Sequence, residues 1–319
     1  MTEEYRECCY LADDLLEYIH QRAWETGNTR RAFWHCTGSE KEGVLNYNDI
    51  DLMSVEPDLL IFDSVEQIPD ETFGHGILLM DTEDCEPGFT RLVVHTGTSA
   101  EVGDVYTEIG NKRYLNATKY MASFAEVSLS TKSFEKHGPA LIIGGEKMDF
   151  VMCFKCLAWP KCANEFIGRP RFSSNPSVQV IDDMTSLGCH VVGISHPQSL
   201  NPDVEFRISF SFVEKHLIRK WSIKQLKCYF LLKELLNNYL GPSSDGSEKG
   251  LCSYFFKTLM FWAIEEYEGQ FWDQNSTFHC VEKLLAKLKV FFVEEKCPNY
   301  FIADNRMVKN VIQMSKLRQ

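Results

Sequence analysis

The hydrophobic pattern of this 319-residue chain changes its period near residue 212, and that change most constrains the fold. Before it, short apolar runs such as LLIFDS, GILLMD and RLVVHT alternate with Gly, Pro and acidic turns, as β-strands do. After it, IKQLKCYFLLKELLNNYL and segments at about 251–267 and 277–295 repeat apolar residues at helical spacing. The chain is therefore predicted to be α+β, with a mixed β-sheet followed by an all-helical C-terminal part.

Several shorter elements can be predicted within these two parts. Residues 2 to about 26 repeat apolar residues near helical spacing, so an N-terminal amphipathic helix is expected. NDIDLMSV and VEFRISFSF are expected as strands, and GPALIIGGEKMDFVMCFKC as two strands joined by a Gly-Gly-Glu-Lys turn. The polar stretch 112–136 is expected to be helical. Ser222 is expected to cap the predicted helix over IKQLKCYFLLKELLNNYL.

The composition favours a protein that stays inside the cell. No apolar run reaches 18 residues, and the acidic N-terminus MTEEYRECCY lacks the layout of a secretory signal. We therefore expect a cytoplasmic protein with no membrane partner, whose twelve cysteines are free thiols. Cys153-x-x-Cys156, followed by Cys162 and Cys189-His190, is the one spacing that suggests zinc. Buried thiols on a strand explain it better, so no zinc is expected.

Charge is spread unevenly along the chain. The net charge of −12 speaks against a nucleic-acid partner, but residues 1–104 carry 23 acidic and 6 basic residues, whereas residues 105–319 carry 22 and 27. A double-stranded nucleic acid would need a basic surface to neutralise its phosphates. Residues 205–240 offer one, although such a run is also typical of a solvated helix face; its basic members are Arg207, Lys215, Arg219, Lys220, Lys224, Lys227 and Lys233.

Three acidic residues and a small turn point to phosphate chemistry. Asp49 and Asp51 stand at i and i+2 on a predicted strand, so they share a face, and Asp149 is a candidate third acid on a neighbouring strand. Three carboxylates suit two hard divalent cations, which in nucleotidyl transfer activate the attacking hydroxyl and neutralise the leaving pyrophosphate. Gly38-Ser39 precedes them as a turn that lets backbone N–H groups approach phosphate oxygens. Alone, each pattern is as typical of a solvated strand edge or a plain loop; together they favour a site.

These segments, taken in order, resemble a known family. TGSEKEG…NDIDLM resembles the Gly-Ser and acidic elements of cyclic GMP-AMP synthase and its relatives, and HGPALIIGGEKMDFVMCF resembles the strand pair that carries their third acid. LAWP…RPR resembles a Mab-21 run, and FRISFSFVEK, CYFLLKEL, CSYFFKTL, QFWD and CPNYFI follow in the family's order. The resemblance covers about residues 30–305. It implies a bilobed nucleotidyltransferase fold, with a catalytic lobe over residues 1–212 and a helical Mab-21-like lobe over residues 213–319.

The resemblance also implies roles for individual residues. Asp49, Asp51 and Asp149 would hold two Mg²⁺ or Mn²⁺ ions, and Gly38 and Ser39 would hold phosphates. The remaining nucleotide contacts implied are Arg207, Ser209 and Ser211 at the bases, Lys233 and Ser253 at the phosphates, and Tyr254 stacked on a base. Singly, these residues have plainer explanations too: Lys233 could be a solvated helix residue, for example, and Tyr254 a core aromatic.

The activity implied is that of a cyclic GMP-AMP synthase-like innate immune receptor. It would join two nucleoside triphosphates, ATP and/or GTP, into a cyclic dinucleotide on sensing a ligand such as double-stranded RNA. The zinc-binding insertion of the vertebrate enzyme is missing, since FVEKHLIRKWSIKQLKC runs straight to Cys228. Two alternatives remain open: a non-catalytic Mab-21 interaction protein that keeps the fold and binds nucleotide as a structural ligand, and a linear transferase such as an oligoadenylate synthase. The three acids favour the first reading over the scaffold, and the helical half favours it over the linear transferase.

Overall fold

The chain divides into two compact units. In this computed structural model, one unit comprises Met1–Lys161 and Met184–Arg219 and is called the sheet unit below; the other comprises Cys162–Asp183 and Lys220–Gln319 and is called the helical unit. The sequence placed a single boundary at residue 212, whereas the units interleave along the chain. The residues described are 33–37, 50–70, 72, 75–96, 105–128, 134–137, 140–143, 148–240 and 252–307, with Glu7, Tyr10 and Leu11.

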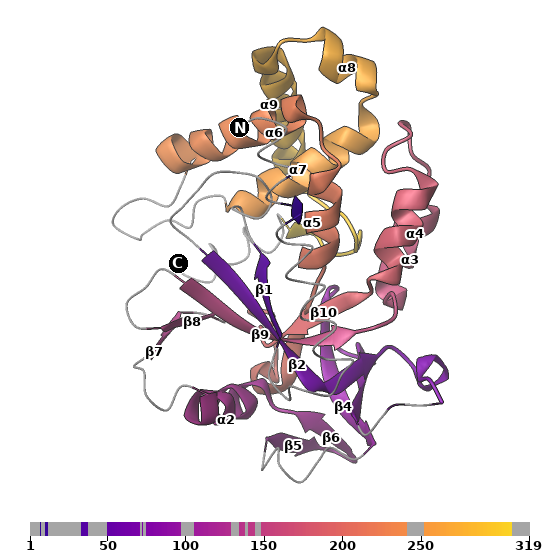
Figure 1. The fold of residues 1–319 in the computed structure, drawn as a ribbon, viewed down its shortest axis with the longest axis vertical. Helices are drawn as coiled ribbons and strands as arrows, with labels where there is room; N and C mark the ends of the chain where they lie inside the picture. The colour runs from indigo at the N-terminus through magenta and orange to yellow at the C-terminus, as the bar shows by residue number, and fades with distance from the viewer. Residues whose placement is uncertain are drawn as a thin grey trace. The chain divides into compact units, whose positions relative to one another are not determined.

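The sheet unit is built on one mixed sheet, with eleven strands among the described residues (Figure 1). The strands are β1 (Phe33–Thr37), β2 (Ile50–Phe62), β3 (Gly76–Asp81), β4 (Phe89–Thr96), β5 (Tyr106–Ile109), β6 (Lys112–Leu115), β7 (Phe134–His137), β8 (Ala140–Ile143), β9 (Met148–Cys156), β10 (Cys189–Val192) and β11 (Glu205–Ser209). Among the described residues, this unit also contains η1 (Val65–Gln67), α2 (Ala117–Ser128), η4 (Pro202–Val204) and α5 (Ser211–Arg219).

The long strand β2 organises the sheet. It pairs in parallel with β9 and with β3, and antiparallel with β1. The pairings run from β2 through β3, β4, β11, β10 and β9 and return to β2, so these six described strands close into a ring. Figure 1 shows β2 and β9 side by side. Two segments that lie about a hundred residues apart in the sequence are thus direct neighbours at the centre of the unit.

The two faces of this sheet carry different side chains. On one face Phe154 contacts Phe206 and Tyr120 of α2 edge to face, with ring centroids 5.9 and 5.1 Å apart. On the opposite face Met53, Val55, Cys153 and Val192 form a buried cluster, against which Phe212 of α5 packs. The sheet is therefore covered on both faces by its own unit, and the second face is the one that concerns the candidate site.

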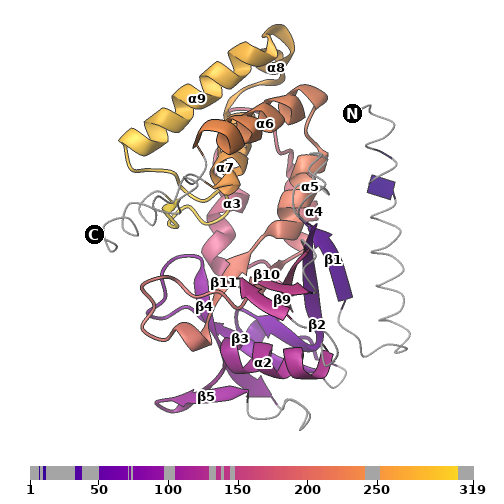
Figure 2. The ribbon, with the colours of Figure 1, turned by 90° about the vertical axis from the view of Figure 1, so that its left-hand side faces the viewer.

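The helical unit contains α3 (Asn164–Gly168), α6 (Ile223–Leu235), η5 (Leu236–Leu240), α7 (Ser253–Glu266), α8 (Gly269–Gln274) and α9 (Thr277–Val293). The short η3 (Lys161–Ala163) and α4 (Val178–Ser186) span the divisions between the two units. The helices α6, α7 and α9 pack on one another (Figure 2). The predicted cap is confirmed, because the Ser222 side chain accepts from the Gln225 backbone while Gln225 reaches back to the Ser222 backbone.

Most predicted elements are confirmed, and two are wrong. The strands β3, β4, β8 and β9 and the helices α6, α7 and α9 occur where the sequence predicts them. In the described part of the stretch 112–136, α2 is helical but the two ends belong to the strands β6 and β7. The strand VEFRISFSF stops at Ser209, and α5 begins at Ser211 with Glu214 bonded to the Phe210 carbonyl. Of the predicted N-terminal helix, only Glu7, Tyr10 and Leu11 are described, and these are helical.

No helix in the described ranges has the length and apolar character that a membrane crossing requires.

Candidate functional site

Two of the three predicted acids are direct partners in the sheet. Asp51 of β2 pairs with Asp149 of β9 in the parallel ladder. Neighbouring strands lie about 4.8 Å apart, and paired positions share a face of the sheet. The backbone positions of Asp51 and Asp149 are therefore neighbours on one face of the sheet. Asp49, Gly38 and Ser39 lie outside the described residues, so their part in the site stays a prediction.

The strand register places further predicted residues on the same face. Asp149 and Cys153 lie four residues apart on β9, and Cys153 pairs with Val192, which in turn pairs with Arg207 of β11. Ser209 stands two residues beyond Arg207 on the same strand. Three separate chain segments thus bring Asp51, Asp149, Arg207 and Ser209 to one face of the sheet, where Arg207 is exposed and Ser209 is largely buried.

Two hydroxyl groups mark the point where β11 passes into α5. The Oγ atoms of Ser209 and Ser211 lie 2.8 Å apart, and either can donate to the other. Ser211 was predicted on the strand, but it is the first residue of α5. Next to it, the Phe212 ring stacks on His190 of β10, with centroids 4.4 Å apart. This stacking fixes the start of α5, and with it the two hydroxyls, beside the face that carries the acids.

The helical unit holds the other three predicted nucleotide contacts. Lys233 of α6 is only 7% exposed, with its Nζ 5.8 Å from the centroid of the Tyr229 ring. The plainer reading of Lys233 as a solvated helix residue is therefore wrong. Ser253 is exposed as the first residue of α7.

Tyr254, next along α7, is neither fully buried nor fully exposed. Its ring packs against the buried cluster of Phe255, Cys297 and Met307. Its hydroxyl accepts a hydrogen bond of 3.1 Å from the side-chain amide of Asn299. Asn299 was not among the predicted site residues, although Pro and Asn are common turn residues and CPNYFI resembles a family motif.

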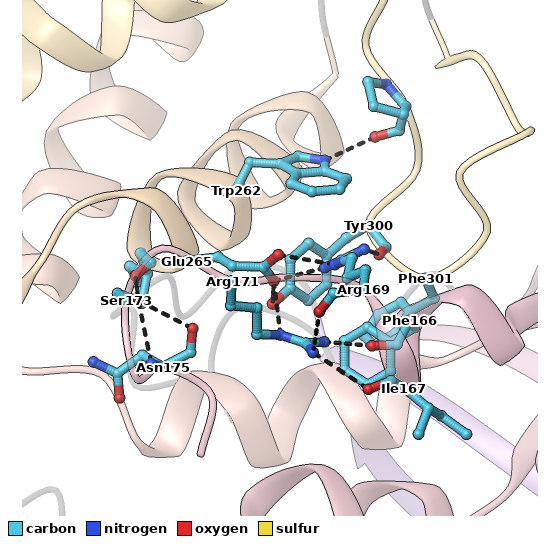
Figure 3. A network of polar contacts seen from close by, with 12 residues as sticks. Phe166, Ile167, Arg169, Arg171, Ser173, Asn175, Trp262, Glu265, Tyr300 and Phe301 are labelled. Carbon is cyan, nitrogen blue, oxygen red and sulfur yellow. Dashed lines mark hydrogen bonds and ion pairs between the residues drawn. The ribbon is translucent and has the colours of Figure 1, made fainter. Parts of the chain in front are cut away.

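A buried ionic network occupies the centre of the helical unit (Figure 3). The Arg169 guanidinium donates to both carboxylate oxygens of Glu265, at 2.8 and 2.7 Å, and to the Tyr300 carbonyl at 2.6 Å. The Tyr300 hydroxyl donates to Glu265 at 2.7 Å, and burial together with that carboxylate raises the pKa of Tyr300. Arg169 also lies over the Trp262 and Tyr300 rings, at 4.2 and 4.4 Å from their centroids.

The second arginine of the Arg-Pro-Arg run completes this network. Arg171 lies 3.4 Å from Glu265 and donates to the carbonyls of Phe166 and Ile167 at the end of α3, as Figure 3 shows. Lone carbonyls at a helix end need such donors. The Arg-Pro-Arg run that carried part of the family resemblance thus joins α3, α7 and the segment around Tyr300.

The cysteine spacing that suggested zinc does not gather a metal site among the described side chains. Cys153 and Cys156 lie three residues apart on β9, so they point to opposite faces, and both are buried. Burial raises the pKa of the Cys153 thiol. Cys156 pairs across the sheet with Cys189, and Cys162 is exposed.

Fewer basic residues of the segment 205–240 are exposed at the surface than the sequence suggested. Lys215 and Lys233 are buried, at 4% and 7% exposure. Lys224 donates to the carbonyls of Asp273 and Asn275 at the end of α8, at 3.1 and 3.0 Å. The exposed basic residues of this run are Arg207, Lys220 and Lys227.

Comparison with family models agrees with this architecture. Residues 89–220 match the Mab-21 protein nucleotidyltransferase domain, and residues 224–318 match the Mab-21 protein HhH/H2TH-like domain. The chain belongs to the Mab-21 family. The family resemblance seen in the sequence is thereby confirmed, and with it an α+β nucleotidyltransferase fold. The Mab-21 nucleotidyltransferase match includes Asp149, Arg207 and Ser209 but begins after β2, so the place of Asp51 rests on its pairing with Asp149.

Proposed function

We propose that this Mab-21 family member is a metal-dependent nucleotidyltransferase whose Asp51 and Asp149, with Asp49, hold two Mg²⁺ or Mn²⁺ ions. The direct pairing of Asp51 with Asp149 carries the proposal. Two carboxylates on adjacent strand positions repel each other unless a cation or a proton lies between them. A scaffold protein has no use for that arrangement, whereas two bound metal ions would activate the attacking hydroxyl and neutralise the departing pyrophosphate.

The remaining residues of the site would bind and orient the nucleotides. Arg207 and the linked hydroxyls of Ser209 and Ser211 would contact the bases from the sheet face. In the second lobe of a bilobed enzyme, Lys233 and Ser253 would hold phosphates and Tyr254 would stack on a base. The low exposure of Lys233 supports this role, because a cation attracts phosphate more strongly where water is scarce.

The proposed product is a cyclic dinucleotide made from ATP and/or GTP. Its synthesis requires two successive transfers in one pocket, with the linear intermediate turned over between them. We include in the proposal that the protein acts in the cytoplasm as an innate immune receptor and that double-stranded RNA activates it. Lys220 and Lys227, both exposed in the helical unit, would contact the duplex phosphates, which A-form RNA presents independently of sequence.

The test is an incubation of the purified chain with all four labelled nucleoside triphosphates and Mg²⁺ or Mn²⁺, with and without double-stranded RNA or DNA. Chromatography should resolve a cyclic dinucleotide. Asp149→Asn should abolish it, because the metal site loses a charged ligand. Asp58→Asn is the matched control, since Asp58 is an exposed acid on β2, beyond the acid pair. It should retain full activity.

The contrary outcomes separate the alternatives. Product formation by Asp149→Asn would contradict the two-metal mechanism. A wild-type chain that binds a nucleotide but forms no product in any combination would be the non-catalytic Mab-21 interaction protein. A ladder of linear oligonucleotides would identify a linear transferase.

A further inference from the structure

The side-chain amide of Asn299 is held in one orientation. Asn299 is largely buried, at 8% exposure, in the segment that follows α9. Its Oδ1 accepts from the backbone N–H groups of Phe301 and Ile302, at 2.9 and 3.1 Å. Since those two groups can only donate, the oxygen must face them and the NH₂ group must face away. The NH₂ group donates to the Tyr254 hydroxyl at 3.1 Å.

The loop that carries Asn299 is held by hydrogen bonds between its two ends and by a hydrogen bond to α7. Met307 donates to the Cys297 carbonyl at 2.9 Å, and the Asn299 backbone donates to Asn305 at 2.8 Å. Pro298 and Arg306 form an antiparallel bridge. Trp262 of α7, labelled in Figure 3, donates from its indole to the Pro298 carbonyl at 3.0 Å. These bonds hold the base of the loop in register with the helix that carries Tyr254.

The two residues that follow Asn299 anchor the loop in the core. Tyr300 and Phe301 are fully buried, and both rings contact Phe166 of α3. The Tyr300 hydroxyl also donates to Glu265, and the Tyr300 carbonyl accepts a hydrogen bond from the Arg169 guanidinium. A cooperative network of this kind moves little, because each member is held by several partners at once. The segment that carries Asn299 is therefore held by several contacts at once.

We propose that Asn299 is a positioning residue that sets the Tyr254 ring in the orientation for stacking on a nucleotide base; this inference rests on the proposed function of Tyr254. The ring is packed along one side by Phe255, Cys297 and Met307. The hydrogen bond from the Asn299 side-chain amide then fixes the hydroxyl end of the ring. Ordering the ring before the nucleotide arrives removes an entropic cost of about 0.5–1.5 kcal/mol from binding. Asn299 touches the tyrosine rather than the substrate, so its effect should lie in KM and not in kcat.

Asn299→Ser tests the inference. A serine hydroxyl can replace the amide oxygen as acceptor for the Phe301 and Ile302 backbones, because serine forms the same kind of turn, so the loop should persist. Serine has no second polar atom to bond the Tyr254 hydroxyl. Aspartate is not suitable, because the Tyr254 hydroxyl could donate to its carboxylate. The variant should raise KM, and the Kd for the nucleotide, about 2- to 10-fold with kcat nearly unchanged. Tyr254→Phe removes the same bond from the other side and should raise KM to a similar extent. In the double variant Asn299→Ser should add nothing, because the bond through which it acts is already absent.

The matched control is Asn275→Ser, in the same unit, where the side-chain amide donates to the Phe271 carbonyl and not to Tyr254. It should leave KM at the wild-type value. Thermal unfolding of each variant checks that the fold is kept. If Asn299→Ser raises KM in the Tyr254→Phe background as well, the shorter side chain and not the lost bond is responsible, and the inference is overturned. An active wild type with unchanged KM in Asn299→Ser overturns the inference alone, whereas a wild type that binds no nucleotide overturns the proposed function with it.

Discussion

Replacing Glu265 by Gln removes the one carboxylate that two guanidinium groups share. The side chains of Glu265, Arg169 and Arg171 are 7%, 8% and 9% exposed, so water screens their charges weakly. Gln has nearly the same shape, and its oxygen can accept one of the bonds that Glu265 accepts. Whichever way the Gln amide is turned, however, its NH₂ group faces a donor of Arg169, because Arg169 bonds both oxygens of Glu265. The variant therefore leaves the buried guanidinium groups of Arg169 and Arg171 beside a neutral side chain that accepts only some of the hydrogen bonds they donate.

The expected loss follows from what a broken buried ion pair costs. Removing one partner of such a pair typically destabilises a protein by about 3–5 kcal/mol, most of it from the uncompensated charge that remains. Because Gln keeps one acceptor, we expect the lower end, about 3 kcal/mol. For domains of roughly this size that loss lowers the Tm by about 6–12 °C.

Thermal unfolding and denaturant titration of Glu265→Gln measure this loss directly. The neighbouring residue supplies the control, since the Glu266 side chain is 45% exposed and forms an ion pair with Lys287. Exposed pairs contribute about 0–1 kcal/mol, so Glu266→Gln should leave the Tm almost unchanged. Equal, small losses in the two variants would refute the reasoning and would mean that water reaches the Arg169–Glu265 pair.

Two further predictions concern the half-buried carboxyl of Glu56 and the surface proposed to bind a duplex. Burial raises the pKa of Glu56, so its ionisation costs stability as the pH rises above its ordinary value of 4.5. Glu56→Gln should therefore unfold at higher denaturant than wild type at pH 7, a gain that disappears below about pH 4.5, and a less stable variant at pH 7 would contradict this. Changing Lys220 and Lys227 together to Glu should abolish stimulation by double-stranded RNA and leave unstimulated product formation intact. The same change at the exposed Lys283 and Lys289 of α9 should leave stimulation intact. If both double variants lose or keep stimulation to the same extent, Lys220 and Lys227 are not the duplex-binding surface.

The sequence determined the elements whose signals are local. Alternation and apolar runs predicted β3, β4 and the pair β8–β9, and helical spacing with the cap at Ser222 predicted α6. The ends of the 112–136 stretch were predicted wrongly because each pairs with a strand outside that stretch, β6 with β5 and β7 with β8. Tyr114 is a strand residue because it pairs with Thr107 of β5 on one side and with Val93 of β4 on the other. Local propensity yields where tertiary pairing competes with it.

Tertiary structure alone decided which candidate residues are neighbours. The sequence named Asp51 and Asp149 as acids on strands, but only the register of β2 against β9 makes them partners. It counted Lys215 and Lys224 as surface charge, whereas packing buries the first and the end of α8 engages the second. It passed over Asn299, whose role depends on a bond to a helix that begins 46 residues earlier. Residue types and their spacing follow from the chain itself, but burial and strand register arise from the simultaneous packing of segments far apart in the sequence.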